Sequence, residues 1–121
     1  MKKRLPPKNL GKALKQGYQP MFMTPNEIST HFRLGDIVTP YTKQDVKETM
    51  DYKLADSKHP QSYDGKTSLF ESVKSEGVKT PLSVETSPHV DRPILVNGHH
   101  RMAISQHLNP KQFVPLQWRN R

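Results

Sequence analysis

Cysteine is absent from this chain of 121 residues. Its absence excludes disulfides, thiolate metal sites and a thiol nucleophile. Long apolar runs are missing too: no apolar run of about 7 to 15 residues follows the basic N-terminus, and none of about 18 residues occurs elsewhere. We therefore expect neither a signal peptide nor a membrane-spanning helix, and we take the cytoplasm as the default location.

Apolar residues are scarce as well. They make up 32% of the chain, the mean hydropathy is −0.83, and there are eleven prolines. A chain of this length usually forms one domain, and this composition predicts a modest core with part of the chain unpacked. We expect a flexible basic arm over residues 1–20 and a single domain over residues 21–121.

Negative charge is scarce, and the formal net charge is +8. Residues 1–20 contain no acid, and their six cations are Lys2, Lys3, Arg4, Lys8, Lys12 and Lys15. Lys111, Arg119 and Arg121 form a second basic group near the other end. Such charges attract the phosphate backbone of a nucleic acid, which makes the arm the predicted nucleic-acid-binding segment. The alternative is a solvated tail that keeps the protein soluble.

Three helices are predicted before residue 80. Thr24-Pro25-Asn26-Glu27 has the residues of a capping box with proline at the first helical position, so a short helix should begin there and end near Leu34-Gly35. The segment 43–57 should be an amphipathic helix, because its apolar residues recur at intervals of four: Val46, Met50 and Leu54. Ser68 and Glu71 offer another capping box, for a helix that Gly77 ends.

The pattern changes from residue 80 onward. Residues 81–85 alternate like a strand, and Ile94-Leu95-Val96 is a continuous apolar run typical of a buried strand. A helix over residues 99–108 and a last strand over residues 112–118 should follow. We read strand, glycine turn, helix and strand as a right-handed βαβ unit at the C-terminal end of an α+β domain with a small mixed sheet.

The turn Gly98-His99-His100-Arg101 carries the most specific chemistry. Glycine between a buried strand and a helix lets the backbone approach a ligand closely, and the first amides of the helix point outward. Arg101 could bind phosphate oxygens with two hydrogen bonds, and either histidine could donate another. These features predict an anion site. The alternative is an ordinary tight turn in which Arg101 pairs with a carboxylate.

Three segments within residues 69–118, a span of about 50 residues, resemble the ParB/sulfiredoxin superfamily. Residues 69–84 resemble its first box, a helix that ends in glycine and leads into a Pro-apolar-x-Val strand. Residues 94–103 resemble the strand, Gly-x-x-Arg turn and helix shared by ParB nucleotide-binding domains, sulfiredoxins and free-serine kinases, and residues 113–116 resemble the next strand. Small phage or plasmid proteins of this kind are often labelled ParB-like nuclease domains.

This resemblance implies a fold, a ligand and a set of binding residues. The fold would be ParB/sulfiredoxin-like, and the ligand would be a nucleotide, ATP or CTP with Mg²⁺, or a nucleic acid. The implied phosphate-binding residues are Gly98, His99, His100 and Arg101, with Gly77, Thr80 and Pro81 lining the same pocket. The alternative function is a DNA nuclease, or a phage or plasmid effector without catalysis that binds a nucleic-acid or protein partner.

Whether the chain is an enzyme stays open at this point. Sulfiredoxin chemistry requires a cysteine, so that activity is excluded. Weak nucleotide hydrolysis or nuclease activity would need a base, and the candidates are His99, His100 and Glu71. No pattern of histidines and carboxylates has the spacing of a metal site, so no structural metal is expected. Nothing in the sequence indicates an oligomeric state.

Overall fold

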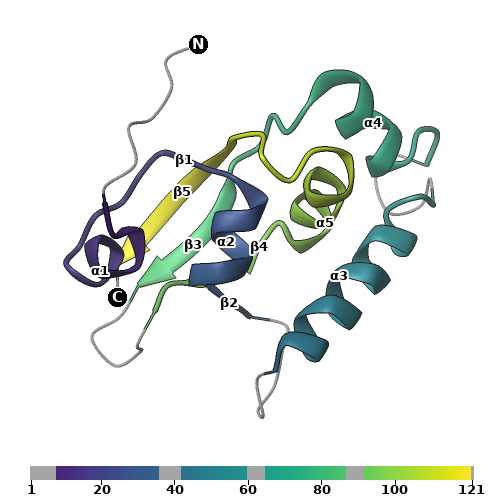
Figure 1. Cartoon of the computed structure of the whole chain (residues 1–121). Helices are drawn as coiled ribbons and strands as arrows, with labels where there is room; N and C mark the ends of the chain where they lie inside the picture. The colour runs from purple at the N-terminus through teal and green to yellow at the C-terminus, as the bar shows by residue number, and fades with distance from the viewer. Residues whose placement is uncertain (1–7, 36–41, 60–64, 87–91, 121) are drawn as a thin grey trace.

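The computed structural model describes residues 8–35, 42–59, 65–86 and 92–120. Their order is α1 (Leu10–Lys15), β1 (Phe22–Met23), α2 (Pro25–His31), β2 (Arg33–Leu34), α3 (Lys43–Asp56), α4 (Leu69–Glu76), β3 (Leu82–Thr86), β4 (Ile94–Asn97), α5 (His99–Leu108) and β5 (Val114–Asn120). In Figure 1, α3 and α4 lie beside α5, and α1 lies at the opposite side of the molecule. The predicted α+β class with a mixed sheet is confirmed at this level.

The five strands form one mixed sheet in the order β1-β5-β3-β4-β2. The central strand, β3, pairs antiparallel with β4 and parallel with β5. At one edge β2 is parallel to β4, and at the other β1 is antiparallel to β5. Val84 therefore has Leu95 of β4 on one side and Trp118 of β5 on the other.

The predicted βαβ unit is wrong. Its two strands would have to be parallel. Here β3 separates β4 from β5 and is antiparallel to one and parallel to the other, so β4 and β5 run in opposite directions. The hydrophobic pattern located both strands and the helix between them, but pairing with β3 sets their relative direction.

Local sequence signals placed the three longer helices well. Thr42 caps α3 with a reciprocal Thr42–Asp45 capping box, and the helix covers nearly all of the predicted segment 43–57. The Ser68 hydroxyl accepts a hydrogen bond from the Glu71 amide at the start of α4, which ends at Gly77 with φ 78°. The predicted helix over residues 99–108 is confirmed as α5.

The helix predicted from Pro25 to about Leu34 is shorter than expected. Its Thr24–Glu27 capping box is present, but α2 ends at His31. Arg33 and Leu34 instead form β2, whose Leu34 pairs in register with Leu95 of β4. The short strands β1 and β2 were missed, because two residues are too few to show an alternating pattern.

The prediction of a flexible arm over residues 1–20 is wrong for its second half. Helix α1 lies there, capped by Asn9, and Leu14 is only 6% exposed. The Nε1–H group of Trp118 donates a hydrogen bond to the Pro20 carbonyl at 2.7 Å, which joins this segment to β5. These contacts offset the conformational entropy that the segment loses when it becomes ordered. The composition had suggested that the segment could not offset this loss. Residues 1–7 of the predicted arm lie outside the described residues.

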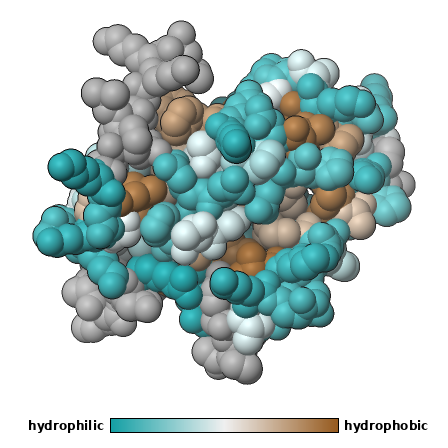
Figure 2. Space-filling model, viewed as in Figure 1, coloured by the Kyte–Doolittle hydropathy of each residue, from teal (hydrophilic) through white to brown (hydrophobic). Residues whose placement is uncertain are grey.

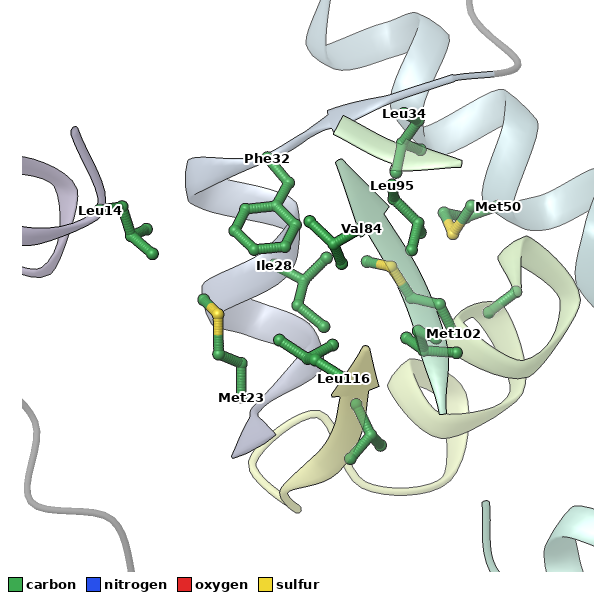
Figure 3. Packing of buried hydrophobic residues seen from close by; sticks show 13 residues of the cluster. Leu14, Met23, Ile28, Phe32, Leu34, Met50, Val84, Leu95, Met102 and Leu116 are labelled. Carbon is green, nitrogen blue, oxygen red and sulfur yellow. The ribbon is translucent and has the colours of Figure 1, made fainter. Parts of the chain in front are cut away.

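The core lies between the sheet and the helices α2 and α5. Figure 3 shows Ile28 of α2 and Phe32, the residue just after this helix, facing Val84 of β3, with Met102 of α5 nearby. Phe32 also meets the Trp118 ring edge-to-face, with ring centroids 5.6 Å apart. Each such large side chain contributes about 1.5–3 kcal/mol by leaving water. The core is modest, as predicted, and it anchors both β4 and α5, which flank the Gly98 turn.

The outer surface is mostly hydrophilic on the face shown in Figure 2, where the apolar residues form small separate patches. Within the described ranges, the exposed large hydrophobic side chains are those of Met21, Phe22, Tyr52 and Leu108. Among the described residues, no helix has the length and hydrophobicity needed to cross a membrane.

Candidate functional site

Gly98 makes the bend between β4 and α5. Its backbone is left-handed, with φ 101° and ψ 20°, a conformation that residues with a Cβ rarely adopt. A Cβ at this position would lie 2.6 Å from Cδ2 of the buried Leu82 and 3.2 Å from Nη2 of Arg101. Both the backbone conformation and the lack of space therefore require glycine.

Helix α5 starts at a residue that has no side chain. Gly98 occupies the N-cap position, so the N-cap residue itself makes no side-chain hydrogen bond to the first turn. By contrast, serine or threonine caps α2, α3 and α4. The first amides of a helix carry partial positive charge, so an anion at this position would act as the cap.

Arg101 folds back over this bend. One guanidinium nitrogen, Nη1, donates hydrogen bonds to the carbonyl oxygens of Thr80 at 2.5 Å and Pro81 at 3.1 Å. The other nitrogen, Nη2, lies close to Gly98. Partial burial lowers the pKa of Arg101 below its ordinary value, because desolvation disfavours the charged form. An anion beside the guanidinium would favour that charged form again.

The two histidines of the turn have different surroundings. His99 is 6% exposed and belongs to the buried face of α5. His100 is half-buried, and its Nε2 atom lies 2.8 Å from Oδ2 of Asp56 at the end of α3. The turn was predicted to direct all four residues at one anion. Gly98 and Arg101 are in contact as that prediction requires, whereas His99 is packed in the interior.

Asp56 is a candidate functional residue that the sequence prediction missed. It is the last residue of α3, 44 positions before its histidine partner. A carboxylate in the last turn of a helix opposes the helix dipole, so it is unfavourable without a cation nearby. That position could have identified Asp56 as a residue with a partner elsewhere in the fold.

The other residues implied by the resemblance are only partly brought together. Thr80 and Pro81 contact Arg101 through their backbone carbonyls, so both border the turn. Gly77 instead lines a separate cavity of about 230 Å³ with residues of α4, α5 and β5. Glu71 is exposed at the start of α4, and within the described residues no hydrogen bond or ion pair joins its carboxylate to the turn.

The predicted nucleic-acid-binding cations fall in two groups. Lys2, Lys3 and Arg4 lie outside the described residues, as does Arg121 near the other end. The side chains of Lys8, Lys12 and Lys15 are exposed, and the last two lie on α1. Lys111 and Arg119 are exposed as well. The lysines of α1 are therefore held by a folded element rather than by an arm.

No group of three or more histidines and carboxylates in the described part of the chain is arranged to hold a metal ion. Comparison of the chain with protein-family models, curated proteins and solved structures finds no match. The residues of the Gly98 turn are therefore the basis for assigning a function.

Proposed function

We propose that this chain is a phosphate-binding domain of ParB/sulfiredoxin type. The residues from Gly98 to Arg101 would bind the phosphates of a nucleotide, ATP or CTP, with Mg²⁺ bound to the nucleotide rather than to a site of its own. The observation that carries the proposal is the position of Arg101, whose guanidinium lies over Gly98, a glycine at the N-cap position where the other two longer helices have Thr42 and Ser68.

Two features of the turn support phosphate as the ligand. Arginine has five N–H donors, and the two hydrogen bonds to Thr80 and Pro81 use only Nη1. Its Nη2 and Nε donors make no hydrogen bond within the described residues, so they can serve an anion beside Gly98. The hydrogen bonds to the two carbonyls hold the guanidinium in place, which reduces the entropy lost on binding.

A second candidate, slow hydrolysis of the bound phosphate compound, is favoured by the pair His100 and Asp56. A carboxylate that holds an imidazole in one orientation is the usual support for a general base. In this scheme His100 would accept a proton from the attacking water, and Asp56 would act as its positioning residue. Glu71 and His99 are weaker candidates for the base. Within the described residues no contact joins the Glu71 carboxylate to the turn, and the His99 side chain is buried.

Calorimetric titration with ATP, CTP, GTP and ADP, with and without Mg²⁺, tests the proposal. We expect at least one nucleotide to bind the intact protein and Arg101→Ala to weaken that binding at least tenfold, since a charged hydrogen bond contributes about 1.5–3 kcal/mol. Arg119→Ala is the matched control, because Arg119 is exposed on β5. Absence of binding by every nucleotide would refute the nucleotide function.

Hydrolysis has its own test. Release of inorganic phosphate and nicking of a plasmid should both be measured on the intact protein, on Asp56→Asn and on His100→Gln. If the pair acts in catalysis, both variants should lose activity, and Asp56→Asn should do so while nucleotide affinity stays within about threefold. Activity that survives in both variants would exclude His100 as the base and leave a binding protein or a contaminant. Plasmid nicking without nucleotide binding would instead support the alternative function as a nuclease.

A further inference from the structure

A second site lies away from the turn, in a cleft between α1, α2 and the residues just before β4. The cleft has a volume of about 520 Å³, within the range of ligand pockets. Lys12 and Lys15 of α1 line one side, Thr30 and His31 of α2 the other, and Arg92 lies before β4. We infer that this cleft, the α1 cleft, binds phosphate groups of a nucleic-acid backbone.

The charge of the α1 cleft is the first observation. Three of its nine lining residues are lysine or arginine, and none is acidic. Two further cavities each include a carboxylate among their lining residues, Asp51 in one and Glu76 in the other. Like charges gathered in a recess whose described lining holds no carboxylate create a positive potential, which concentrates anions.

The second observation is that the fold holds these cations in place. Leu14 on α1 is buried in the core, and this fixes the helix that carries Lys12 and Lys15. These lysines are three residues apart, so they lie on one helix face. Neither makes an ion pair within the described residues. Charges that a folded helix already holds in place bind an extended polyanion at a lower entropic cost than charges on an unfolded arm would.

Close packing of α1 on α2 forms the base of the cleft. A Cβ at Gly11 would lie 3.3 Å from Nδ1 of His31, so the glycine lets the imidazole approach the helix closely. Leu14 and Pro93 supply apolar surface beside the cations. The described residues that line the cleft include no tyrosine, tryptophan or phenylalanine, so they offer no platform for base stacking. Cations with no aromatic platform fit the sugar–phosphate backbone better than a nucleobase.

The α1 cleft and the Gly98 turn are different sites. Arg92 and Pro93 precede β4, and Gly98 follows it, so the two sites lie at opposite ends of the strand, roughly 20 Å apart at about 3.3 Å per residue. In Figure 1, α1 lies at the end of the sheet toward which the arrows of β3 and β5 point, and α5 begins at the other end. The inference therefore does not depend on the proposed nucleotide function.

The test compares two variants with the same loss of charge. Affinity for a fluorescent single-stranded dT20 and for a 20-base-pair duplex is measured from 50 to 200 mM salt on the full chain. Lys12→Gln/Lys15→Gln removes two cations of the cleft, and Lys74→Gln/Lys111→Gln removes two exposed lysines elsewhere. Both double variants should unfold at the temperature of the unmodified protein, because all four side chains are exposed.

The expected result is a change in the salt dependence. Each lost phosphate contact lowers the slope of log affinity against log salt by about 0.7 for a single strand, so the cleft variant should lose about 1.4. The control variant should keep the slope of the unmodified protein. An unchanged slope in the cleft variant, or an equal drop in the control, would overturn the inference and leave only a general positive charge.

Small phosphate compounds are the competing ligands for the same chemistry. Pyrophosphate and ATP should therefore be titrated into the unmodified protein and the cleft variant. We expect Lys12→Gln/Lys15→Gln to leave ATP affinity within about twofold while it weakens oligonucleotide binding. If pyrophosphate or ATP binding falls and the oligonucleotides are unaffected, the cleft takes a small phosphate compound and the nucleic-acid assignment is wrong. Failure of the nucleotide proposal would show separately, as absence of ATP binding at the turn.

Discussion

The Nε2 atom of His100 lies 2.8 Å from Oδ2 of Asp56, and this contact joins the first turn of α5 to the last residue of α3. Their side chains are 31% and 41% exposed, so solvent screens the pair. The contact fixes the direction of His100 at the edge of the Gly98 turn. Its contribution to the free energy of unfolding should therefore be small.

The first prediction concerns the energy of this pair. In a double-mutant cycle, Asp56→Ala and His100→Ala should show a coupling free energy of about 0.5–1 kcal/mol, because a partly exposed ion pair contributes little. Urea unfolding of the two single variants and the double variant measures it. A coupling near zero would mean that the two side chains do not interact in solution, and hydrolysis by an oriented His100 would then lose its support.

Much of this region could be predicted from the sequence, because its signals are local. Thr24, Ser68 and Gly98 are capping residues whose neighbours determine where α2, α4 and α5 begin. Asp56 could not be paired with His100 in this way, because only the packing of α3 on α5 brings them together. For the same reason the sequence could not show that β3 lies between β4 and β5.

The arm is the clearest case of tertiary packing that overrides composition. Lysine, proline and glycine in residues 1–20 predicted disorder. The outcome for residues 10–15 depends on Leu14, a single apolar side chain that reaches the core, while Leu10 and Tyr18 pack at its margin. Leu10, Leu14 and Tyr18 recur at intervals of four, so a helical pattern was present, but the composition of the segment outweighed it in the prediction.

The second prediction tests that docking. Leu14→Ala should lower the free energy of unfolding by about 2 kcal/mol, the lower end for a buried leucine, because the residue lies at the edge of the core. Leu108→Ala is the matched control, and it should cost well under about 1 kcal/mol because Leu108 is 41% exposed. Urea denaturation followed by Trp118 fluorescence reports both. Equal effects of the two substitutions would show that α1 is not packed on the core in solution.

The third prediction separates backbone strain from crowding at Gly98. Gly98 and Gly17 have nearly the same φ, 101° and 98°, but nothing lies within 4 Å of a Cβ placed at Gly17. Gly17→Ala should therefore cost only the left-handed backbone term, about 1–2 kcal/mol. Gly98→Ala carries the same term and also meets Leu82, so it should cost at least about 1 kcal/mol more.

Thermal and urea unfolding of the two alanine variants measure this difference. Leu82→Val in the Gly98→Ala background provides a further check, because the shorter side chain should reduce the crowding and recover part of the lost stability relative to Leu82→Val alone. If Gly98→Ala costs no more than Gly17→Ala, the close approach of Leu82 to the turn is absent in solution, and other residues could occupy the bend.

The fourth prediction concerns the structural part of Arg101's role. Arg101→Lys keeps the positive charge, but a single ammonium cannot reproduce both the two carbonyl hydrogen bonds from Nη1 and the position of Nη2 over Gly98. We expect a loss of about 1 kcal/mol in the free energy of unfolding, since the carbonyls of Thr80 and Pro81 are partly reached by water. The side chain of Arg119 is 71% exposed, so Arg119→Lys should change the free energy of unfolding by only a few tenths of the change expected for Arg101→Lys.

If the guanidinium also binds phosphate, Arg101→Lys should weaken nucleotide binding in calorimetry and Arg119→Lys should not. A lysine variant as stable as the unmodified protein would show that the hydrogen bonds to Thr80 and Pro81 do not hold Arg101, and the preorganised anion site at Gly98 would have to be abandoned.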